Sequence, residues 1–253
     1  MIYVTGDCHA DFHKFSSRAF RKQKEMTRDD FVIVCGDFGI WSDVEADTER
    51  LDWLSDKPFT LLFVDGNHED FDRLYGEEFE VVDFHGGRAH KIRENIYHLI
   101  RGYIFNIDGK NIFAFGGASS HDIQDGILEP SDYEDLTSLA RDYNKRTRRG
   151  EMLRINHISW WKEEMPSDEE MEFGLTTLSE HQNKVDFIIS HCCPQHVAST
   201  ISKGVYQPDK LTAYFDKIAD TVDFSKWFFG HYHRDMVVSD KYIMLYHQIT
   251  QIA

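Results

Sequence analysis

The segment FVIVCGD at residues 31–37 shows the feature that decides the fold, a run of strand-forming residues that ends abruptly in glycine and aspartate. The same arrangement occurs as MIYVTGD at residues 1–7 and as TLLFVDGN at residues 60–67. The closing polar residues are 30 positions apart in turn, about the length of one strand, one helix and the return to the next strand. The sequence therefore predicts buried strands in an α/β arrangement.

The stretches between these runs have the spacing of amphipathic helices. Apolar residues recur at helical intervals within residues 12–20 and again within residues 44–54. A β-α-β-α-β order implies parallel strands joined by right-handed crossovers. Ligands bind at the carboxyl ends of the strands in such sheets, so we expect Asp7, Asp37 and Asn67 to meet at one edge.

A second pattern begins near residue 95, where short strand-like runs are separated by tight turns. Residues 95–100, 103–107 and 111–115 predict antiparallel hairpins. Further strands are expected at residues 185–190, 226–229 and 242–246.

Residues 119–182 interrupt the strands with a charged sequence that we expect to be helical. One helix start is clear, because Ser167 stands three residues before Glu170 in the spacing of a capping box. No repeat and no low-complexity linker divides the chain. We therefore expect one domain over residues 1–253, with a helical insertion or cap at residues 119–182 that roofs the functional site.

The composition is that of an acidic globular protein. The 253 residues include 28 basic and 44 acidic side chains, and 41% are hydrophobic. The net charge of -16 repels phosphates, so binding to duplex nucleic acid is disfavoured. The apolar runs are far shorter than the ~18 residues of a membrane span, and no secretory signal pattern is visible, so we expect a cytoplasmic protein. The four cysteines lack metal-binding or redox spacing and are expected to be reduced and buried.

Polar residues that can hold a metal follow five of the predicted strands. Gly230-His231 repeats the glycine-plus-polar ending, and Ser190-His191 does so without the glycine. Oxygen and imidazole donors without thiolates suit divalent ions such as manganese, iron or zinc. The set is too large for one tetrahedral zinc, whereas two ions that share one carboxylate accommodate it, as in two-metal sites that act on phosphorus. The candidates are Asp7, His9, Asp37, Asn67, His68, His191, His231 and His233.

Such a cluster has a favourable charge for binding a phosphate. Two divalent ions, two aspartates and one hydroxide leave a net charge of about +1, even within an acidic protein. The ions also lower the pKa of a bridging water toward neutrality. His68 then remains free to donate a hydrogen bond to the phosphoryl group or a proton to the leaving oxygen.

Five motifs of the chain resemble, in identity and order, those of the calcineurin-like metallophosphoesterases. They are Gly6-Asp7-Cys8-His9, Gly36-Asp37, Gly66-Asn67-His68-Glu69, His191 and Gly230-His231-Tyr232-His233. The resemblance implies a four-layer α/β/β/α sandwich with two central mixed sheets. It also implies hydrolysis of a phosphate ester by attack of a metal-bridging hydroxide.

The resemblance further implies a role for each residue. Asp37 bridges the two ions, and His68 is the catalytic histidine. One ion takes Asp7, His9, Asp37 and His233, and the other takes Asp37, Asn67, His191 and His231.

Two departures bear on the substrate. Protein serine/threonine phosphatases of this kind carry Asp-Arg-Gly after the second motif and an arginine just before Gly-Asn-His, whereas this chain has Phe38-Gly39-Ile40-Trp41 and Asp65. An anionic side chain cannot clamp a phosphate, so we lean toward a phosphodiester or nucleotide substrate. The aspartate that orients the catalytic histidine in those enzymes has no evident match, although Glu69 and Asp70 are candidates.

Several alternatives stay open at this point. The enzyme readings include a phosphomonoesterase, a phosphoprotein phosphatase and a nuclease, and the non-enzyme reading is a scaffold that binds a partner over the metal face. The basic run at residues 141–149 and the pair Trp160-Trp161 fit a solvated helix face and core packing better than substrate docking and base stacking. His121 and Asp122 are weak candidates for the border of the pocket.

Overall fold

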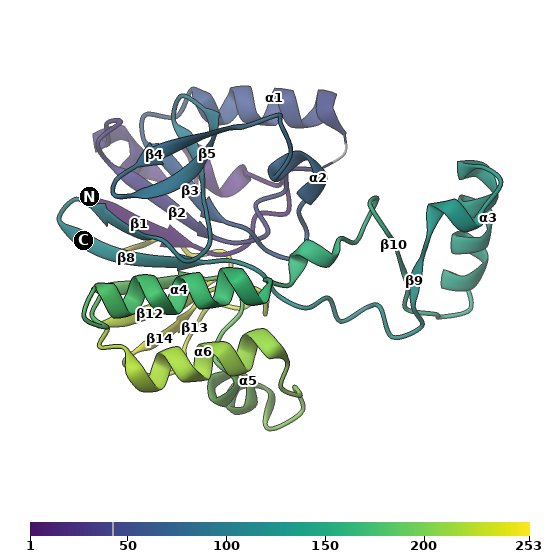
Figure 1. Cartoon of the computed structure of the whole chain (residues 1–253). Coiled ribbons are helices and arrows are strands. Elements are labelled where there is room, and N and C mark those ends of the chain that lie inside the picture. Colours follow the sequence, from purple (N-terminus) through teal and green to yellow (C-terminus); the bar gives the residue numbers. More distant parts are fainter. Residues whose placement is uncertain (42) are drawn as a thin grey trace.

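The computed structural model describes residues 1–41 and 43–253, and its centre consists of two β-sheets (Figure 1). The first sheet has seven strands in the order β15-β1-β2-β3-β6-β5-β4. These strands are β1 (Ile2–Thr5), β2 (Phe31–Cys35), β3 (Thr60–Val64), β4 (Glu80–Phe84), β5 (Gly87–Arg93), β6 (Ile96–Leu99) and β15 (Thr250–Gln251).

The second sheet has six strands in the order β13-β14-β12-β11-β8-β7. They are β7 (Ile104–Ile107), β8 (Lys110–Phe115), β11 (Phe187–Ser190), β12 (Lys226–Phe229), β13 (Met236–Val237) and β14 (Tyr242–Met244). β8, β11, β12 and β14 run parallel, whereas β7 and β13 are antiparallel edge strands. Both sheets are therefore mixed.

The first three strands pair in parallel, as the repeated glycine-plus-polar endings predict. Ile2 lies beside Phe31, and Phe31 lies beside Thr60, so the strands start level. All residues of β1, β2 and β3 are buried, which fits strands that are covered on both faces. Because the strands start and end together, the polar residues after them reach the same edge.

The first connection is not the helix that the spacing at residues 12–20 predicts. It forms two short 3-10 segments, at His13–Phe15 and Arg21–Glu25. The Ser16 hydroxyl accepts the backbone N–H of Ala19, and the Gln23 amide donates to the carbonyl of Phe15. These side-chain bonds compete with the backbone i→i−4 hydrogen bonds that an α-helix needs. The prediction of a helix at residues 12–20 is therefore wrong.

The second connection is the predicted helix, α1 (Val44–Ser55). The Asp43 carboxylate accepts the Ala46 N–H and caps its first turn. Leu51 and Leu54 face inward and pack on the outer side of the first sheet.

The hairpin prediction is half correct. β7 and β8 form the predicted antiparallel hairpin, whereas residues 95–100 do not pair with β7. Instead β6 pairs with β3 and β5 in the first sheet, and the chain crosses to the second sheet at Gly102. Gly102 has φ +85, a conformation that other residues rarely adopt, and its N–H donates to Ala114 of β8.

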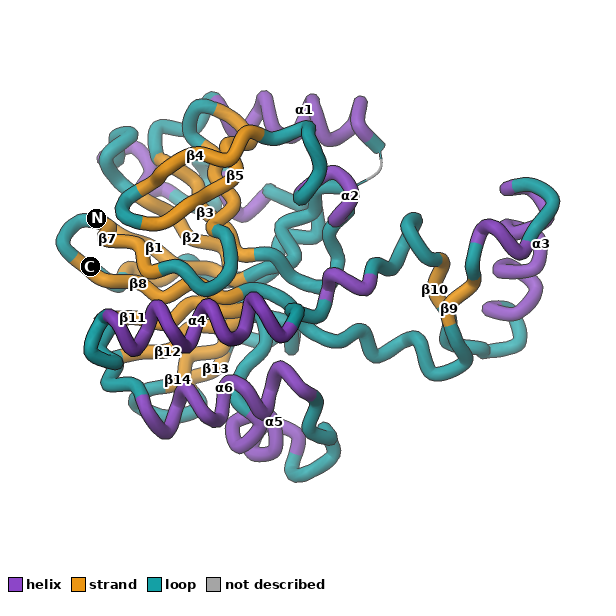
Figure 2. The backbone as a smooth tube through the Cα atoms, viewed as in Figure 1, coloured by secondary structure: helices purple, strands orange, loops and turns teal. Residues whose placement is uncertain are grey.

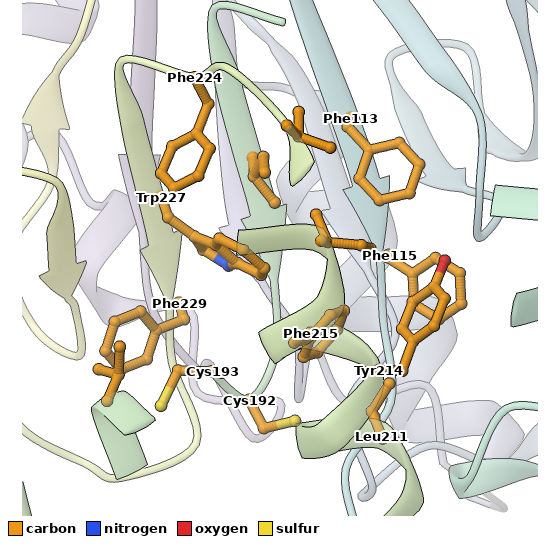
Figure 3. Close-up of a cluster of buried hydrophobic side chains, with 14 of the residues drawn as sticks. Phe113, Phe115, Cys192, Cys193, Leu211, Tyr214, Phe215, Phe224, Trp227 and Phe229 are labelled. Atoms are coloured by element: carbon orange, nitrogen blue, oxygen red, sulfur yellow. The ribbon is translucent and has the colours of Figure 1, made fainter. Parts of the chain in front are cut away.

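The core has three parts, which define four layers. Apolar residues of the two sheets, among them Ile33, Leu62 and Ile189, form one cluster between the sheets. The outer face of the second sheet packs against α4 (Asp168–Glu180), α5 (Gln195–Ser202) and α6 (Lys210–Thr221), where Trp227 lies among phenylalanines (Figure 3). With α1 on the outer face of the first sheet, this is the expected α/β/β/α sandwich.

The segment between β8 and α4 leaves the sandwich as an arm of residues 121–161 (Figure 2). It contains β9 (Ile127–Leu128), α3 (Leu136–Thr147) and β10 (Arg154–Ile155), and α3 lies at its far end (Figure 1). A small cluster of its own, including Leu139 and Leu153, holds the arm together. α4 begins with the predicted capping box of Ser167 and Glu170.

Three further observations complete the fold. All four cysteines are buried, and none forms a disulfide. No helix within residues 1–41 and 43–253 is long and apolar enough to cross a bilayer. The remaining short helices are α2 (Phe71–Leu74) and 3-10 turns at Pro130–Asp132 and Lys162–Glu164.

Candidate metal centre

The two sheets bring their polar loop residues to one place. Asp7 and His9 follow β1, Asp37 follows β2, and Asn67 and His68 follow β3 of the first sheet. His191 follows β11, and His231 and His233 follow β12 of the second sheet. The side chains in question come from five strands that are distant in sequence.

Four of these side chains form a compact cluster. One ligand atom from each of Asp7, His9, Asp37 and His233 lies within 4.8 Å of the others. Nε2 of His9 is 3.0 Å from Nε2 of His233, and Nε2 of His233 is 3.2 Å from Oδ2 of Asp7. Two imidazole nitrogens that face each other beside a carboxylate are typical of ligands directed at a common cation.

One buried carboxylate oxygen in this cluster lacks a hydrogen bond within residues 1–41 and 43–253. Oδ2 of Asp7 is buried and forms no satisfactory hydrogen bond with any described residue, although His233 lies near it. The nearby lysine does not neutralise this carboxylate, because Lys14 donates to the backbone carbonyls of Gly6 and Asp7. A buried carboxylate oxygen without a hydrogen bond is costly, so this arrangement fits a bound divalent ion.

A second group lies on the other side of Asp37. Nε2 of His191 is 3.4 Å from Oδ1 of Asp37 and 3.2 Å from Oδ1 of Asn67. Nδ1 of His191 donates to the carbonyl of Cys35 at 2.8 Å, which leaves Nε2 as the atom available to a metal. The ring of His231 packs edge-on against that of His191 with a centroid separation of 4.9 Å. Asp37 is thus shared by both groups.

The charges of the centre favour cation binding. Burial opposes a charge on His191, but Asp37 and Asp7 outweigh it and raise the pKa of His191 to about 10. Burial also works against ionisation of Asp37, yet the His191 charge holds the pKa of that carboxyl well below its usual range. A divalent ion would replace the proton on His191 as the partner of these carboxylates.

The glycines of the motifs allow the opposite strands to hold the carboxylates. The His231 N–H donates to Oδ1 of Asp7, and the His68 N–H donates to Oδ1 of Asp37, both at 2.9 Å. A Cβ at Gly230 would lie 2.0 Å from Oδ1 of Asp7. Each aspartate is therefore fixed by backbone from another motif, at a distance that only glycine permits.

The backbone at the centre is unusual. His9, Asp37, His231 and His233 have φ values of 48, 46, 66 and 50, in the left-handed region. Such conformations are uncommon for residues with side chains and concentrate at functional sites. Four of the seven predicted metal ligands therefore depend on a conformation that costs stability.

Sequence reasoning missed the residues that orient Asn67. Its amide nitrogen donates to the Ser120 hydroxyl at 3.3 Å, and that hydroxyl donates to Glu164 at 2.6 Å. The contact turns Oδ1 of Asn67 toward His191. Ser120 and Glu164 lie in the segment 119–182, and Glu164 looks like a surface charge because it follows another glutamate. No sequence signal distinguishes it.

The structure explains the aspartate that replaces an arginine before Gly66. The Asp65 carboxylate is fully buried and binds the guanidinium of Arg101 and Nε2 of His98. It serves as an interior ion-pair partner, so neither it nor Arg101 offers a phosphate-binding charge at this position. Burial opposes ionisation of Asp65, but the Arg101 charge holds the pKa of that carboxyl well below its usual range.

His68 lies beside the cluster of Asp7, His9, Asp37 and His233, and its side chain is half-buried. Burial lowers the pKa of His68, with Asp37 opposing this effect and Arg154 adding to it. Glu69 accepts the N–H groups of Phe38, Gly39 and Ile40, which anchors the second motif. The Glu69 carboxylate is therefore engaged in holding this loop.

Two other candidates lie close by. Oδ1 of Asp70 accepts the Arg73 N–H at the start of α2. Nε2 of His121 is 3.0 Å from Nε2 of His231, so the weak candidate His121 does reach the centre. Asp122 pairs with Arg154, whose position no sequence pattern indicated.

Comparisons with known proteins give three results. A family model described as calcineurin-like phosphoesterase matches residues 1–235. Among solved structures, the phosphopantetheinyl hydrolase from Mycobacterium tuberculosis is similar at 14% sequence identity and a TM-score of 0.41, covering 97% of this chain and 89% of that chain. No significant match was found among curated proteins.

Proposed function

The chain belongs to the calcineurin-like phosphoesterase family, and on that premise we propose that it is a cytoplasmic phosphoesterase that uses two divalent ions. The observation that carries this proposal is the cluster of Asp7, His9, Asp37 and His233 around an unsatisfied buried carboxylate oxygen. In a purely structural polar cluster, such a buried oxygen is normally hydrogen-bonded. In a metal-dependent enzyme, that oxygen would bind the metal ion.

The residues would divide between two ions that share Asp37. Asp7, His9, Asp37 and His233 would hold one, and Asp37, Asn67, His191 and His231 would hold the other. When bound, the ions supply a water-derived nucleophile at neutral pH and positive charge for the phosphoryl oxygens. Manganese, iron and zinc all suit these oxygen and imidazole donors.

His68 would assist from the side of the leaving group. Its lowered pKa favours the neutral ring at physiological pH, and a neutral imidazole still carries one N–H. That N–H can donate to a phosphoryl oxygen or to the leaving oxygen as charge develops there. Trp41 restrains this segment, because its indole N–H donates to the His68 carbonyl at 3.0 Å.

A phosphodiester or nucleotide is the substrate class that we favour. Asp65 stands at the position of the missing arginine, and the nearby Arg101 is already paired with Asp65 inside the protein. A phosphomonoester carries more charge than a diester and gains more from such an arginine. The net charge of -16 argues against long nucleic-acid substrates.

The test is hydrolysis of bis-p-nitrophenyl phosphate and of p-nitrophenyl phosphate by manganese-loaded protein, with chelated protein as the control. We expect faster cleavage of the diester and loss of activity in the chelator. Faster cleavage of the monoester would redirect the proposal to phosphomonoesters. No cleavage of either ester, with two metals present per chain, would favour a scaffold and contradict the proposal.

A further inference from the structure

A cavity of about 340 Å³ lies next to His68, where the base of the arm meets the first sheet. Trp41 and His68 line it from the loops after β2 and β3, and Arg154, Ile158 and Trp161 line it from the arm. The arm is attached here by Asp72 of α2, which accepts the indole N–H of Trp161 at 2.8 Å and contacts His157 at 2.8 Å. The cavity therefore has walls of fixed position.

Arg154 is the cationic side chain that lines this cavity. Its Nε lies 2.9 Å from both oxygens of Asp122, its Nη2 lies 2.7 Å from Oδ2 of Asp122, and its Nη1 donates to the carbonyl of Ser159 at 3.2 Å. Of the five N–H groups of a guanidinium, these contacts use three. No residue within 1–41 and 43–253 is hydrogen-bonded to the remaining donors of Arg154, so these donors can bind an anion, and the side chain is 20% exposed.

The apolar walls point to a second part of the ligand. Trp41 and Ile158 are 37% and 43% exposed, and both line this cavity, so a ligand there can reach their apolar surfaces. The Trp41 ring is fixed by its bond to the His68 carbonyl. A flat organic group could pack against these two side chains with little loss of side-chain entropy.

We propose that Arg154 binds a phosphate oxygen of the substrate, and that Trp41 and Ile158 contact a flat apolar group of the ester, such as an aryl or nucleoside group. This inference rests on the proposed function, because it assumes that phosphate reaches the metal centre beside His68. The arm would thus provide the arginine that the motif positions lack. Asp122 is a positioning residue that holds this arginine in place.

The first test measures binding of inorganic phosphate to manganese-loaded protein by calorimetry. Arg154→Ala should weaken binding roughly 10-fold or more, as expected for loss of a charge-assisted hydrogen bond, and Arg154→Lys should recover part of the loss. Arg149→Ala is the matched control, because it removes the same charge from an exposed position after α3 and should leave the affinity unchanged. Metal content and melting temperature of each variant show that the fold is intact.

The second test separates the organic group from the phosphate. Trp41→Leu should raise the KM for the p-nitrophenyl ester that the enzyme cleaves roughly 5-fold or more, and leave phosphate affinity unchanged. Trp41→Phe keeps an aromatic face and should recover most of the KM. An unchanged KM in Trp41→Leu would overturn the aromatic part of the inference.

The two proposals fail in different ways. If Arg154→Ala binds phosphate like the unsubstituted protein while ester hydrolysis continues, the inference about Arg154 is wrong and the proposed function stands. If the unsubstituted protein holds two metals and binds phosphate through Arg154 but hydrolyses no ester, the proposed function is wrong.

Discussion

The metal-ligand edge of the sandwich and the arm differ in how firmly the fold holds them. At the edge, Asp7, Asp37 and His191 are buried, and each is bonded to backbone of another strand loop. In the arm, the apolar cluster has four buried residues with two partly buried tyrosines packed against them, and Leu136 stays 68% exposed. The whole sandwich therefore holds the atoms at the edge in position, whereas only a small core holds the arm.

This contrast suggests a division of tasks between the strand ends, which carry the proposed reactive groups, and the arm, which would contribute to substrate recognition. The reactive groups come from strand ends, whose positions the whole sandwich determines. Two of the residues that we expect to contact the substrate, Arg154 and Ile158, come from the base of the arm, and the third, Trp41, comes from the loop after β2. Loops and insertions of this kind can change among proteins with one scaffold, because few core contacts depend on them.

The largest effect should come from the residue that both ligand groups share. Asp37→Asn keeps the shape and the acceptor for the His68 N–H but removes the charge that both proposed ions would need. Hydrolysis should fall to the level of chelated protein. Asp240→Asn, at an exposed turn, is the matched control and should retain full activity. Substantial activity in Asp37→Asn would contradict the account of the edge.

Next in size is the effect of removing the side chain that does not ligate. His68→Ala should lower kcat roughly 10²-fold to 10⁴-fold, the usual contribution of a positioned acid or hydrogen-bond donor. Metal content should be unchanged, since His68 is not among the proposed metal ligands. Turnover and bound metal are measured on the same preparation. A variant with normal kcat would remove His68 from the mechanism.

A third prediction addresses the independence of the arm. Leu139→Ala opens a cavity in the cluster of the arm, where a buried leucine contributes about 2 to 5 kcal/mol. Amide hydrogen exchange should accelerate over residues 127–155 and stay slow in β1 to β3. Leu211→Ala, in the cluster under the second sheet, is the contrasting variant and should lower the melting temperature of the whole protein. Equal global destabilisation by both variants would show that the arm is not a separate unit.

The smallest effect is on the pH dependence of stability, and it comes from a buried histidine outside the proposed metal centre. His90 stacks on His98 and is buried, and burial lowers its pKa to about 3. In the unfolded chain its pKa is about 6.5, so the stability it contributes is present above pH 6.5 and is lost as the pH falls toward 3. Between pH 7 and pH 5, this loss is up to about 2 kcal/mol.

His90→Gln cannot gain a proton in the unfolded state, so this part of the loss should vanish. Urea unfolding of both proteins at pH 7 and pH 5 measures the difference. Hydrolysis at pH 7 should be the same in both. If the two proteins lose equal stability between these pH values, His90 does not titrate on unfolding.

The parts of the fold that sequence could predict are those with a local cause. Strand ends with glycine and a polar residue, α1, and the capping box of Ser167 each carry their signal within a few residues. β4 and β5 carry no comparable signal, because charged and polar residues interrupt the apolar pattern of EVVDF and GRAHKIR. The partner of β6 could not be predicted either, since a short apolar run does not specify which sheet it joins.

The candidate site divides in the same way. The motif residues can be predicted from sequence because each lies within a few positions of a strand end, next to glycine in most cases. Ser120, Glu164 and Arg154 were missed because they act through positions that only the folded chain brings together. Asp65 was noticed as a departure, but its partner Arg101 is 36 residues away, and the sequence shows no link between the two.

The number of metal ions bound per chain tests the central claim most directly. Protein loaded with manganese and freed of excess metal should contain two ions per chain by elemental analysis, because the two ligand groups share Asp37. His191→Gln should retain about one, since the cluster of Asp7, His9, Asp37 and His233 stays complete. One ion or none in the unsubstituted protein, or two in His191→Gln, would contradict a two-metal centre built on Asp37.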